Sequence, residues 1–245
     1  MKALVFAAGL GNRLKPITDT VPKALVPVGG KPMLEHVILK LKEAGFTDIT
    51  VNIHHLGQQI IDFLQEKNNF GIDIHISDER EYLLDTGGGI KHAEHFLNGN
   101  EPFLVHNVDI FSNIDLKELY NRHLENKALA TLLVSKRKTS RYLLFNKENQ
   151  LCGWRNRETG EVKSYYPYFN PDQYQQFAFS GIHVISPEIF RWMEDWTGKF
   201  SIIQFYLSIC VKTNIQAYEV PGLKLLDVGK KETLTLAEEW VKENL

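Results

Sequence analysis

Four charged residues in this chain have types and settings that suit chemistry on phosphate groups. Arg13 follows a glycine-containing turn, Lys23 follows Pro22, and Asp109 and Asp227 each follow an apolar run. Arginine and lysine can neutralise a transferring phosphoryl group. Two carboxylates that act together with substrate phosphates are a common ligand set for Mg²⁺. The combination predicts chemistry on phosphate groups that depends on positioning and charge neutralisation.

The turn itself, Gly9-Leu10-Gly11-Asn12, follows an apolar strand predicted over residues 4–8. Glycines allow the backbone to approach an anion, and successive N–H groups can then surround phosphate oxygens. The spacing excludes a P-loop, and Leu14 stands where a dinucleotide fingerprint needs its third glycine. A tight strand-to-helix connection can have the same glycine pattern, and Arg13 alone is typical of a surface charge. Arg13 and Lys23 together favour a phosphate-binding loop.

Longer motifs resemble those of the sugar-1-phosphate nucleotidyltransferases. The resemblance starts with AAGLGNRLKP at residues 7–16 and PKALVPV at residues 22–28. It continues with KPMLE at 31–35, LDTGGGI at 84–90, FSGI at 179–182 and LDVG at 226–229, so that it covers almost the whole chain. Within the family, the TGGG and FSGI segments and the short C-terminus are most similar to uridylyltransferases that act on N-acetylmuramate 1-phosphate.

This resemblance implies specific roles. Arg13 is expected to neutralise the β- and γ-phosphates, and Lys23 to bridge the α-phosphate and the sugar phosphate. Asp109 and Asp227 are expected to hold Mg²⁺. The implied nucleotide-binding residues are Ala8, Gly9, Gly11, Asn12, Arg13, Thr86, Gly87 and Gly88, and the implied sugar-binding residues are Asn107, Ser180 and Gly181.

The two aspartates have a second interpretation, and the sequence departs from the family pattern at two points. Without the resemblance, each aspartate is more typical of a loop cap or turn. Val108 precedes Asp109 where relatives have glycine, which replaces a permissive backbone position with a β-branched residue. A Glu-Lys-Pro segment that relatives use near the sugar is absent, which leaves three basic residues as candidates for its lysine: Arg155, Arg157 and Lys163.

The resemblance implies an enzyme that transfers a nucleoside monophosphate from a triphosphate to a sugar 1-phosphate and releases pyrophosphate. UTP with N-acetylmuramate 1-phosphate or a similar sugar is the first expectation, with a role in cell-wall recycling. A GTP-dependent mannose- or heptose-1-phosphate guanylyltransferase is the alternative. Val108 and the missing segment also leave open a regulatory protein that binds nucleotide without catalysis.

The composition bounds the partners and the location. The 245 residues carry a net charge of −2, with 43% hydrophobic and 24% charged residues, which is typical of a globular protein and gives no basic excess for nucleic acid. No apolar stretch of spanning length and no signal peptide is apparent, so we expect a cytoplasmic protein without membrane contact. Small-molecule substrates and a monomer or small homo-oligomer are expected. Cys152 and Cys210 are predicted to be free thiols, and the histidines to be structural or surface residues.

Strand and helix patterns alternate through the first half of the chain, which predicts an α/β fold: a Rossmann-like open, mostly parallel sheet with helices on both faces. We expect one domain over residues 1–245, with a variable insertion or lid at about 137–175. The aromatic run at 165–169 in that region fits sugar contact or a small satellite core equally well. The predicted strands are 4–8, 49–53, 72–77, 103–108, 128–135 and 178–185, and the predicted helices are 33–44, 56–66, 87–96, 116–123, 187–196, 202–211 and 231–245.

Overall fold

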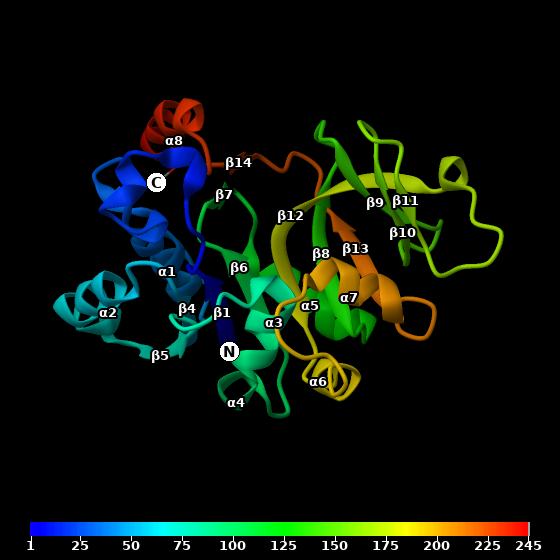
Figure 1. The fold of residues 1–245 in the computed structure, drawn as a ribbon, viewed down its shortest axis with the longest axis horizontal. Helices are drawn as coiled ribbons and strands as arrows, with labels where there is room; N and C mark the ends of the chain where they lie inside the picture. Colours follow the sequence, from blue (N-terminus) through cyan, green and yellow to red (C-terminus); the bar gives the residue numbers. More distant parts are fainter. Residues whose placement is uncertain (245) are drawn as a thin grey trace.

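A ten-stranded mixed sheet forms the centre of the molecule in the computed structural model, which describes residues 1–244 (Figure 1). Four neighbouring strands are parallel to one another, and their alternation with helices confirms the predicted α/β class. Their order in the sheet is β6 (Phe103–Asn107), β1 (Lys2–Phe6), β4 (Asp48–Ile53) and β5 (Asp73–Asp78). The carboxyl ends of these strands therefore meet at one edge, where ligands bind in open α/β sheets.

The rest of the sheet is mainly antiparallel and comes from one continuous stretch of chain. It contains β8 (Ala130–Ser135), β9 (Arg141–Phe145), β10 (Leu151–Asn156), β11 (Val162–Lys163), β12 (Gln175–Ile185) and β13 (Ile215–Glu219). The long strand β12 joins the two parts because it pairs with β6 on one side and with β8 and β9 on the other. The region around 137–175, expected to be an insertion or lid, thus forms the meander β9–β11 at the sheet edge.

Two short strands connect these parts. Strand β7 (Ile110–Ser112) pairs antiparallel with β14 (Leu225–Asp227), just beyond the carboxyl end of β6. Next to this pair, the Asn113 N–H donates to the Lys224 carbonyl oxygen at 3.3 Å, and the Lys224 N–H donates to Asn113 Oδ1 at 2.8 Å. The chain therefore leaves this part of the fold at residue 113 and returns to it at residue 224, which is a neighbouring point. We call residues 113–224 the inserted half, and residues 1–112 with 225–244 the parallel half. A separate hairpin pairs β2 (Pro27–Val28) with β3 (Lys31–Pro32).

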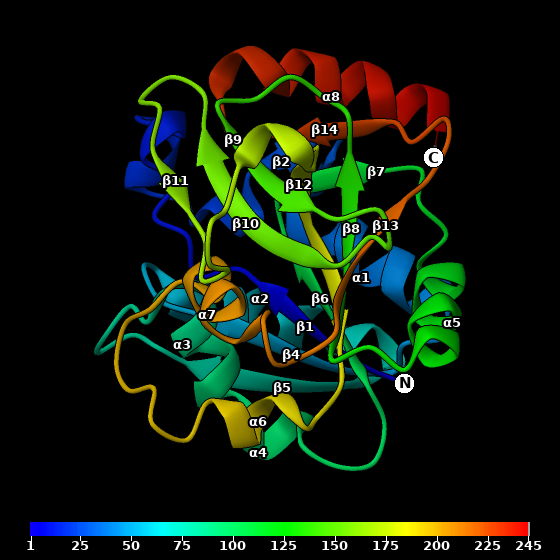
Figure 2. The same cartoon turned by 90° about the vertical axis from the view of Figure 1, so that its right-hand side faces the viewer.

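Helices cover both faces of the sheet (Figures 1 and 2). Strand β1 shows why, because Ala3 and Val5 enter one core cluster and Leu4 between them enters the other. The first cluster is covered by α1 (Met33–Glu43), α2 (Gly57–Glu66), α5 (Leu116–Asn126) and α8 (Lys231–Asn244). The second is covered by α3 (Asp85–His92), α4 (Glu94–Leu97), α6 (Ile189–Trp192) and α7 (Ile202–Ile209).

Most predicted helices are present, with changed boundaries. Helix α1 ends where predicted, before Gly45, whose positive φ of 90° suits a glycine. The helix predicted over 87–96 starts earlier and is divided into α3 and α4 at Ala93, and the one over 187–196 contracts to α6. The C-terminal helix is described to Asn244, so its predicted last residue, Leu245, lies outside the described residues. Among residues 1–244, no helix is both long enough and apolar enough to cross a membrane.

The aromatic run at 165–169 divides between packing and exposure. The Tyr166 hydroxyl donates to the Cys210 carbonyl oxygen at 3.3 Å, and Phe169 stacks on Tyr174 with ring centroids 4.5 Å apart. Tyr165 and Tyr168 are exposed. These contacts favour the satellite-core interpretation of the run. Cys152 and Cys210 are free thiols, as predicted, and both are buried.

Candidate active site

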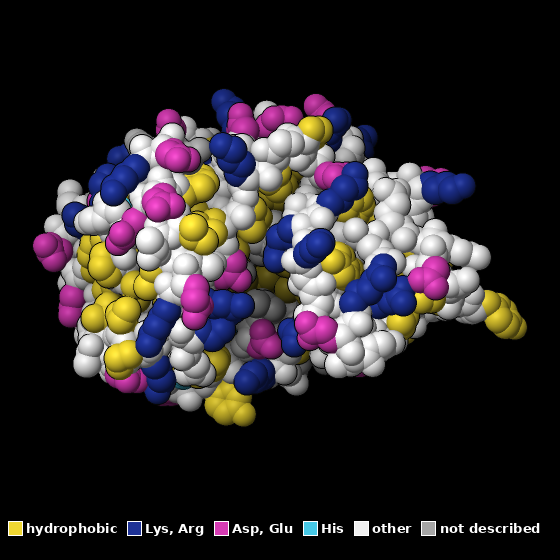
Figure 3. Space-filling view, turned by 90° about the horizontal axis from the view of Figure 1, so that it is seen from above, with side chains coloured by type: hydrophobic (Ala, Val, Ile, Leu, Met, Phe, Trp, Pro, Cys, Tyr) yellow, Lys and Arg dark blue, Asp and Glu magenta, His cyan; other side chains and the backbone are white. Residues whose placement is uncertain are grey.

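A cavity of about 330 Å³ lies at the carboxyl ends of the parallel strands. It brings together six of the residues that the motifs single out: Ala8, Gly9, Lys23, Thr86, Asn107 and Asp109. The space-filling view from above this edge shows a hollow in the middle of the molecule with Lys and Arg side chains beside it (Figure 3). A larger hollow of about 780 Å³ is lined by none of the motif residues. We therefore take the smaller cavity as the candidate active site.

The glycine turn after β1 is held open by side chains from elsewhere. Asn52, at the end of β4, accepts hydrogen bonds from the Ala7 and Ala8 N–H groups at 2.7 and 3.1 Å. Gly11 has a φ of +66°, and its carbonyl oxygen accepts from Thr18 Oγ1 at 2.9 Å. Within residues 1–244, none of the backbone N–H groups of residues 9–13 donates a hydrogen bond. The turn thus keeps a row of free donors, as an anion-binding nest requires.

Lys23 and the two aspartates come from distant segments but meet beside this turn. The Lys23 ammonium forms an ion pair with Asp109, and both side chains are largely buried. The pairing of β14 with β7 brings Asp227 opposite Ile110, and the Val228 N–H donates to the Asp109 carbonyl oxygen at 2.8 Å. The short strand β14 therefore places the second carboxylate.

Gly229 marks the point on which these groups converge. A methyl group added at Gly229 would lie 2.5 Å from Arg13 Nη2, 2.7 Å from Asp227 Oδ1 and 3.2 Å from Asp109 Oδ2. The Gly229 N–H also donates to Asp227 Oδ1 at 2.8 Å. Arg13, exposed and outside the lining of the cavity, therefore stands beside both carboxylates. The absence of a side chain at residue 229 is what allows this approach.

The donor set fits a hard cation such as Mg²⁺. Asp109 and Asp227 present carboxylate oxygens to one small region, and hard cations prefer oxygen ligands. In the described part of the chain, no group of three or more His, Cys, Asp or Glu residues could hold a metal by itself. Two carboxylates leave positions for water and substrate phosphates, which is how magnesium is commonly bound.

Asn52 and Glu79 line the cavity and were missed from the sequence. Glu79 is only 2% exposed. Its Oε1 accepts from Asn52 Nδ2 at 2.8 Å, and its Oε2 accepts from the Leu84 N–H at 3.1 Å. Each follows or ends a parallel strand, as Asp109 does. That position at the strand ends is the one signal that could have identified them, since neither belongs to a motif.

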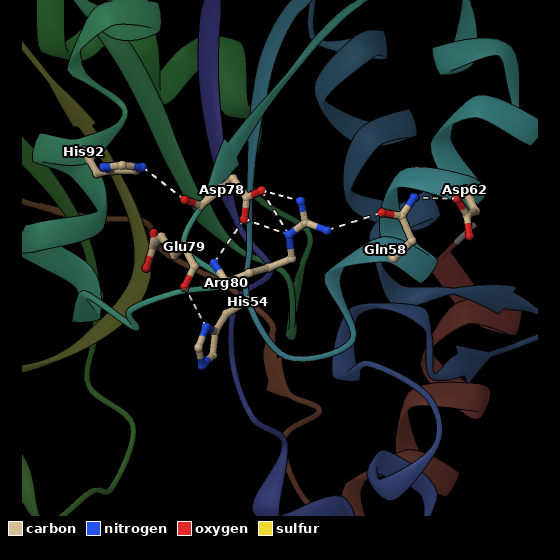
Figure 4. A network of polar contacts seen from close by, with 7 residues as sticks. All are labelled: His54, Gln58, Asp62, Asp78, Glu79, Arg80 and His92. Carbon is tan, nitrogen blue, oxygen red and sulfur yellow. Dashed lines mark hydrogen bonds and ion pairs between the residues drawn. The ribbon is translucent and has the colours of Figure 1, made fainter.

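The loop that carries Glu79 is fixed by a network of polar contacts (Figure 4). Arg80 holds the Asp78 carboxylate through its Nε and Nη2 atoms, and these hydrogen bonds keep the pKa of Asp78 below its usual value. His54 Nδ1 lies 2.7 Å from the Glu79 carbonyl oxygen, and His92 Nε2 lies 3.2 Å from that of Asp78. These two histidines thus have the structural role expected of them.

The glycines of α3 are placed differently from the expectation. Gly87 and Gly88 are buried and outside the cavity lining, and both N–H groups donate to the Phe200 carbonyl oxygen, at 2.9 and 3.2 Å. A methyl group at Gly88 would lie 2.4 Å from the Gly198 carbonyl oxygen. Their small size lets α3 pack against the segment before α7, while neighbouring Thr86 faces the cavity. The N–H groups of both glycines are thus engaged within the protein.

The three expected sugar-binding residues also separate. Ser180 is 2% exposed, and its hydroxyl donates to the Leu133 carbonyl oxygen at 2.6 Å, so its side chain belongs to the core. Gly181 has a φ of +79°, and a methyl group there would lie 2.5 Å from Asn107 Nδ2. Asn107 lines the cavity. Gly181 therefore makes room for Asn107 next to the site.

Residues 106 and 108, on either side of Asn107, are buried. Val108 is 3% exposed, and its N–H donates to the Phe6 carbonyl oxygen at 3.2 Å, so the valine in place of the family's glycine fits into the core. Burial lowers the pKa of His106 to about 4. Its Nδ1 lies 2.8 Å from the Asn107 carbonyl oxygen. Asn107 and Asp109 are thus carried by a segment that is fixed in the core.

Comparison with known families identifies the family of this chain. The nucleotidyl transferase family matches residues 2–242. This chain belongs to that family. The resemblance that the motifs indicated is therefore confirmed, and the fold agrees: a putative glucose-1-phosphate thymidylyltransferase from Bacillus anthracis superimposes with a TM-score of 0.82 at 21% identity, covering 99% of this chain and 96% of the other. HddC from Yersinia pseudotuberculosis, complexed with GMP-PN, gives a TM-score of 0.75 at 23% identity over 98% and 99% of the two chains.

Curated relatives are more similar in sequence over shorter stretches. N-acetylmuramate alpha-1-phosphate uridylyltransferase of Neisseria meningitidis is 46% identical over 115 residues, which is 47% of this chain and 49% of the relative. A probable mannose-1-phosphate guanylyltransferase of Oryza sativa is 37% identical over 138 residues, 56% of this chain and 38% of the relative. The matched stretches span about half or less of the length of these relatives.

Proposed function

We propose that this protein transfers a nucleoside monophosphate from a nucleoside triphosphate to a sugar 1-phosphate, with release of pyrophosphate. The observation that carries the proposal is the convergence of Arg13, Asp109 and Asp227 on Gly229, with Lys23 paired to Asp109. Four charged groups from separate parts of the chain meet beside a cavity and a row of free N–H donors. This arrangement suits a site that binds a triphosphate and a second phosphate group next to each other.

In the proposed reaction, the turn after β1 binds the phosphates of the triphosphate, and the nucleoside lies in the cavity beside Asn52 and Glu79. An oxygen of the sugar phosphate attacks the α-phosphorus, and the bond to the β-phosphate oxygen breaks, so that pyrophosphate leaves. Lys23 holds the two anionic phosphates together, and Arg13 neutralises the departing pyrophosphate. Asp109 and Asp227 would hold Mg²⁺, which would offset charge on the phosphoryl oxygens.

UTP and N-acetylmuramate 1-phosphate are the proposed substrates. The 46% identical stretch shared with the Neisseria uridylyltransferase supports this pair over the guanylyltransferases. The corresponding role is cell-wall recycling in the cytoplasm, by a monomer or small homo-oligomer. GTP with mannose or heptose 1-phosphate is the second candidate, because the same phosphate-binding residues serve either base.

The test is pyrophosphate release with Mg²⁺, with UTP, GTP, CTP and dTTP each offered several sugar 1-phosphates. We expect turnover with UTP and N-acetylmuramate 1-phosphate, its loss on chelation of the metal, and its loss in Lys23→Ala. Lys15→Ala is the matched control, because Lys15 lies in the same loop but forms an exposed ion pair with Asp19. Preference for GTP and a hexose phosphate would support the second candidate. Nucleotide binding without release from any pair would contradict catalysis.

A further inference from the structure

A second cavity, of about 420 Å³, lies in the inserted half and combines positive charge with aromatic surface. Its basic lining residues are Arg137, Arg141 and Lys163, and its aromatic ones are Tyr142, Trp154 and Phe179. They come from β9–β12 and the loop before β9, and Ser201 and Gln204 at the start of α7 complete the wall. The cavity has no part in the phosphate chemistry described above.

The two cavities are neighbours. Lys199 lines the first and Ser201 lines the second. Between them, the Ile202 N–H donates to Oγ1 of Thr86, a residue of the first cavity, at 3.0 Å. Phe179, which lines the second cavity, lies two positions before Gly181. Gly181 packs against Asn107, which lines the first cavity. A sugar joined to a phosphate at Lys23 therefore has this second cavity beside it.

The arginines of the second cavity lack acidic partners. Within residues 1–244, no carboxylate lies within 4.0 Å of the Arg137 or Arg141 guanidinium group. Among the described residues, the Arg137 guanidinium group donates one hydrogen bond, to the Phe179 carbonyl oxygen at 3.2 Å. Lys163 lies 5.2 Å from the Trp154 ring centroid and pairs with Glu161. Two guanidinium groups without carboxylates thus border one cavity.

The other basic residues of this region are already engaged. Arg155 pairs with Asp172 at 2.6 Å, and Arg157 donates to the Gln176 side-chain oxygen through two nitrogens. Neither lines the second cavity. Of the three residues considered as replacements for the missing family lysine, the structure leaves Lys163 facing this cavity.

We propose that the second cavity binds the sugar of the acceptor and that Arg137 and Arg141 bind a carboxylate carried by that sugar. The inference rests on the proposed function and extends it to the acceptor class: an acidic sugar 1-phosphate with a second anionic group. Because Lys23 binds the phosphate of the acceptor, a sugar with no second charge would leave the Arg137 and Arg141 guanidinium groups without a partner. A carboxylate matches the forked donors of arginine, and the faces of Tyr142 and Trp154 offer apolar surface to a sugar ring.

The experiment compares two acceptors that differ only in the carboxylate-bearing lactyl ether, N-acetylmuramate 1-phosphate and N-acetylglucosamine 1-phosphate. Their kcat/KM ratio is measured with UTP for the wild type, Arg137→Gln and Arg141→Gln. We expect each substitution to lower the ratio by roughly 10- to 100-fold through KM for the acidic acceptor, the range for a charge-assisted hydrogen bond, with little change in KM for UTP. Arg157→Gln is the matched control and should keep the wild-type ratio.

Calorimetric binding of the same two acceptors separates failure of this inference from failure of the proposed function. Preferential binding of the acidic acceptor that is lost in Arg141→Gln supports the inference even if no pyrophosphate is released. Turnover with an unchanged ratio in both arginine variants would overturn the inference and leave the proposed function intact. Equal binding of the two acceptors by the wild type would also overturn it.

Discussion

The parallel half and the inserted half make their sites by different means. In the parallel half, the turn after β1 and the short β7–β14 pair fix the groups through backbone hydrogen bonds, and charged side chains meet around one glycine. In the inserted half, the second cavity is formed by long side chains that project from a sheet surface, such as Arg137 and Arg141. The first kind of site requires particular residues at fixed spacing, whereas the second tolerates exchange of its side chains. Under the two proposals above, the phosphate chemistry and the choice of acceptor belong to different halves.

The strongest test of this division is Asp109→Asn. Loss of the carboxylate that pairs with Lys23 should lower kcat by roughly 10²- to 10³-fold, the range for removing one group that stabilises transition-state charge. The loss should be equal for every acceptor, because Asp109 belongs to the phosphate site. Steady-state pyrophosphate release measures it, and Asp19→Asn, at an exposed loop carboxylate, is the control. A loss that differed strongly between acceptors would break the division.

The contact between the halves is tested by Gly88→Ala. The added methyl group would meet the Gly198 carbonyl oxygen and Leu84 Cβ, and overpacking of this kind costs roughly 1–3 kcal/mol. Urea unfolding should show this loss in the free energy of unfolding. KM for the triphosphate should rise as well, because Thr86 precedes this contact and lines the cavity. Unchanged stability would mean that the halves are not tightly packed here.

Acid sensitivity should be greater in the inserted half, which holds two buried histidines with a lowered pKa, whereas the parallel half holds His106. Burial lowers the pKa of His123 to about 4 and that of His183 to about 3. Both stay neutral in the folded protein, whereas the unfolded chain binds their protons near pH 6.5. Stability is therefore fully present above pH 6.5 and falls below it, by about 1.4 kcal/mol per pH unit for each histidine.

Urea unfolding at pH 6.5 and 5.5 measures this effect. His183→Gln removes one of the three buried histidines whose pKa is lowered, so the loss of stability over that interval should shrink by about 1 kcal/mol. His95→Gln, at an exposed histidine, should leave the loss as it is in the wild type. An equal loss in the wild type and in His183→Gln would place the acid sensitivity elsewhere.

The smallest effect is expected at Tyr168, whose side chain is fully exposed at 104%. Tyr168→Ser should change the free energy of unfolding by less than about 0.5 kcal/mol and leave acceptor kcat/KM within a factor of about two. Thermal unfolding and pyrophosphate release provide the measurements. A large rise in acceptor KM would extend the sugar site to the aromatic run and enlarge the inserted half's part in recognition.

How well the sequence predicts the fold differs from one element to the next. The parallel strands and α1 were predicted because their apolar patterns are long and periodic. Strand β14 has three residues and only half-buried side chains, so no periodic signal marks it. Its pairing with β7 is a tertiary effect. The sequence predicts only an insertion or lid where the β9–β11 meander lies, because that region is polar and rich in turn residues.

The site was predictable where its residues stand in contiguous motifs, as Gly9 and Lys23 do. Asn52 and Glu79 are isolated residues, and nothing near them in the sequence marks them. Gly87 and Gly88 were noticed, but a glycine that allows close packing of a helix has the same sequence signature as one that faces a ligand. Only the position of Phe200 distinguishes the two, and that position depends on the inserted half.

The junction at Asn113 and Lys224 has a consequence for how such proteins can change during evolution. Because the inserted half enters and leaves through two hydrogen-bonded neighbours, recombination at these two points would exchange one uninterrupted gene segment. The new segment would need a strand able to pair with β6 as β12 does, and both carboxylates would stay in the host. An ancestral protein could acquire a new acceptor in a single genetic event while its phosphate chemistry was inherited unchanged.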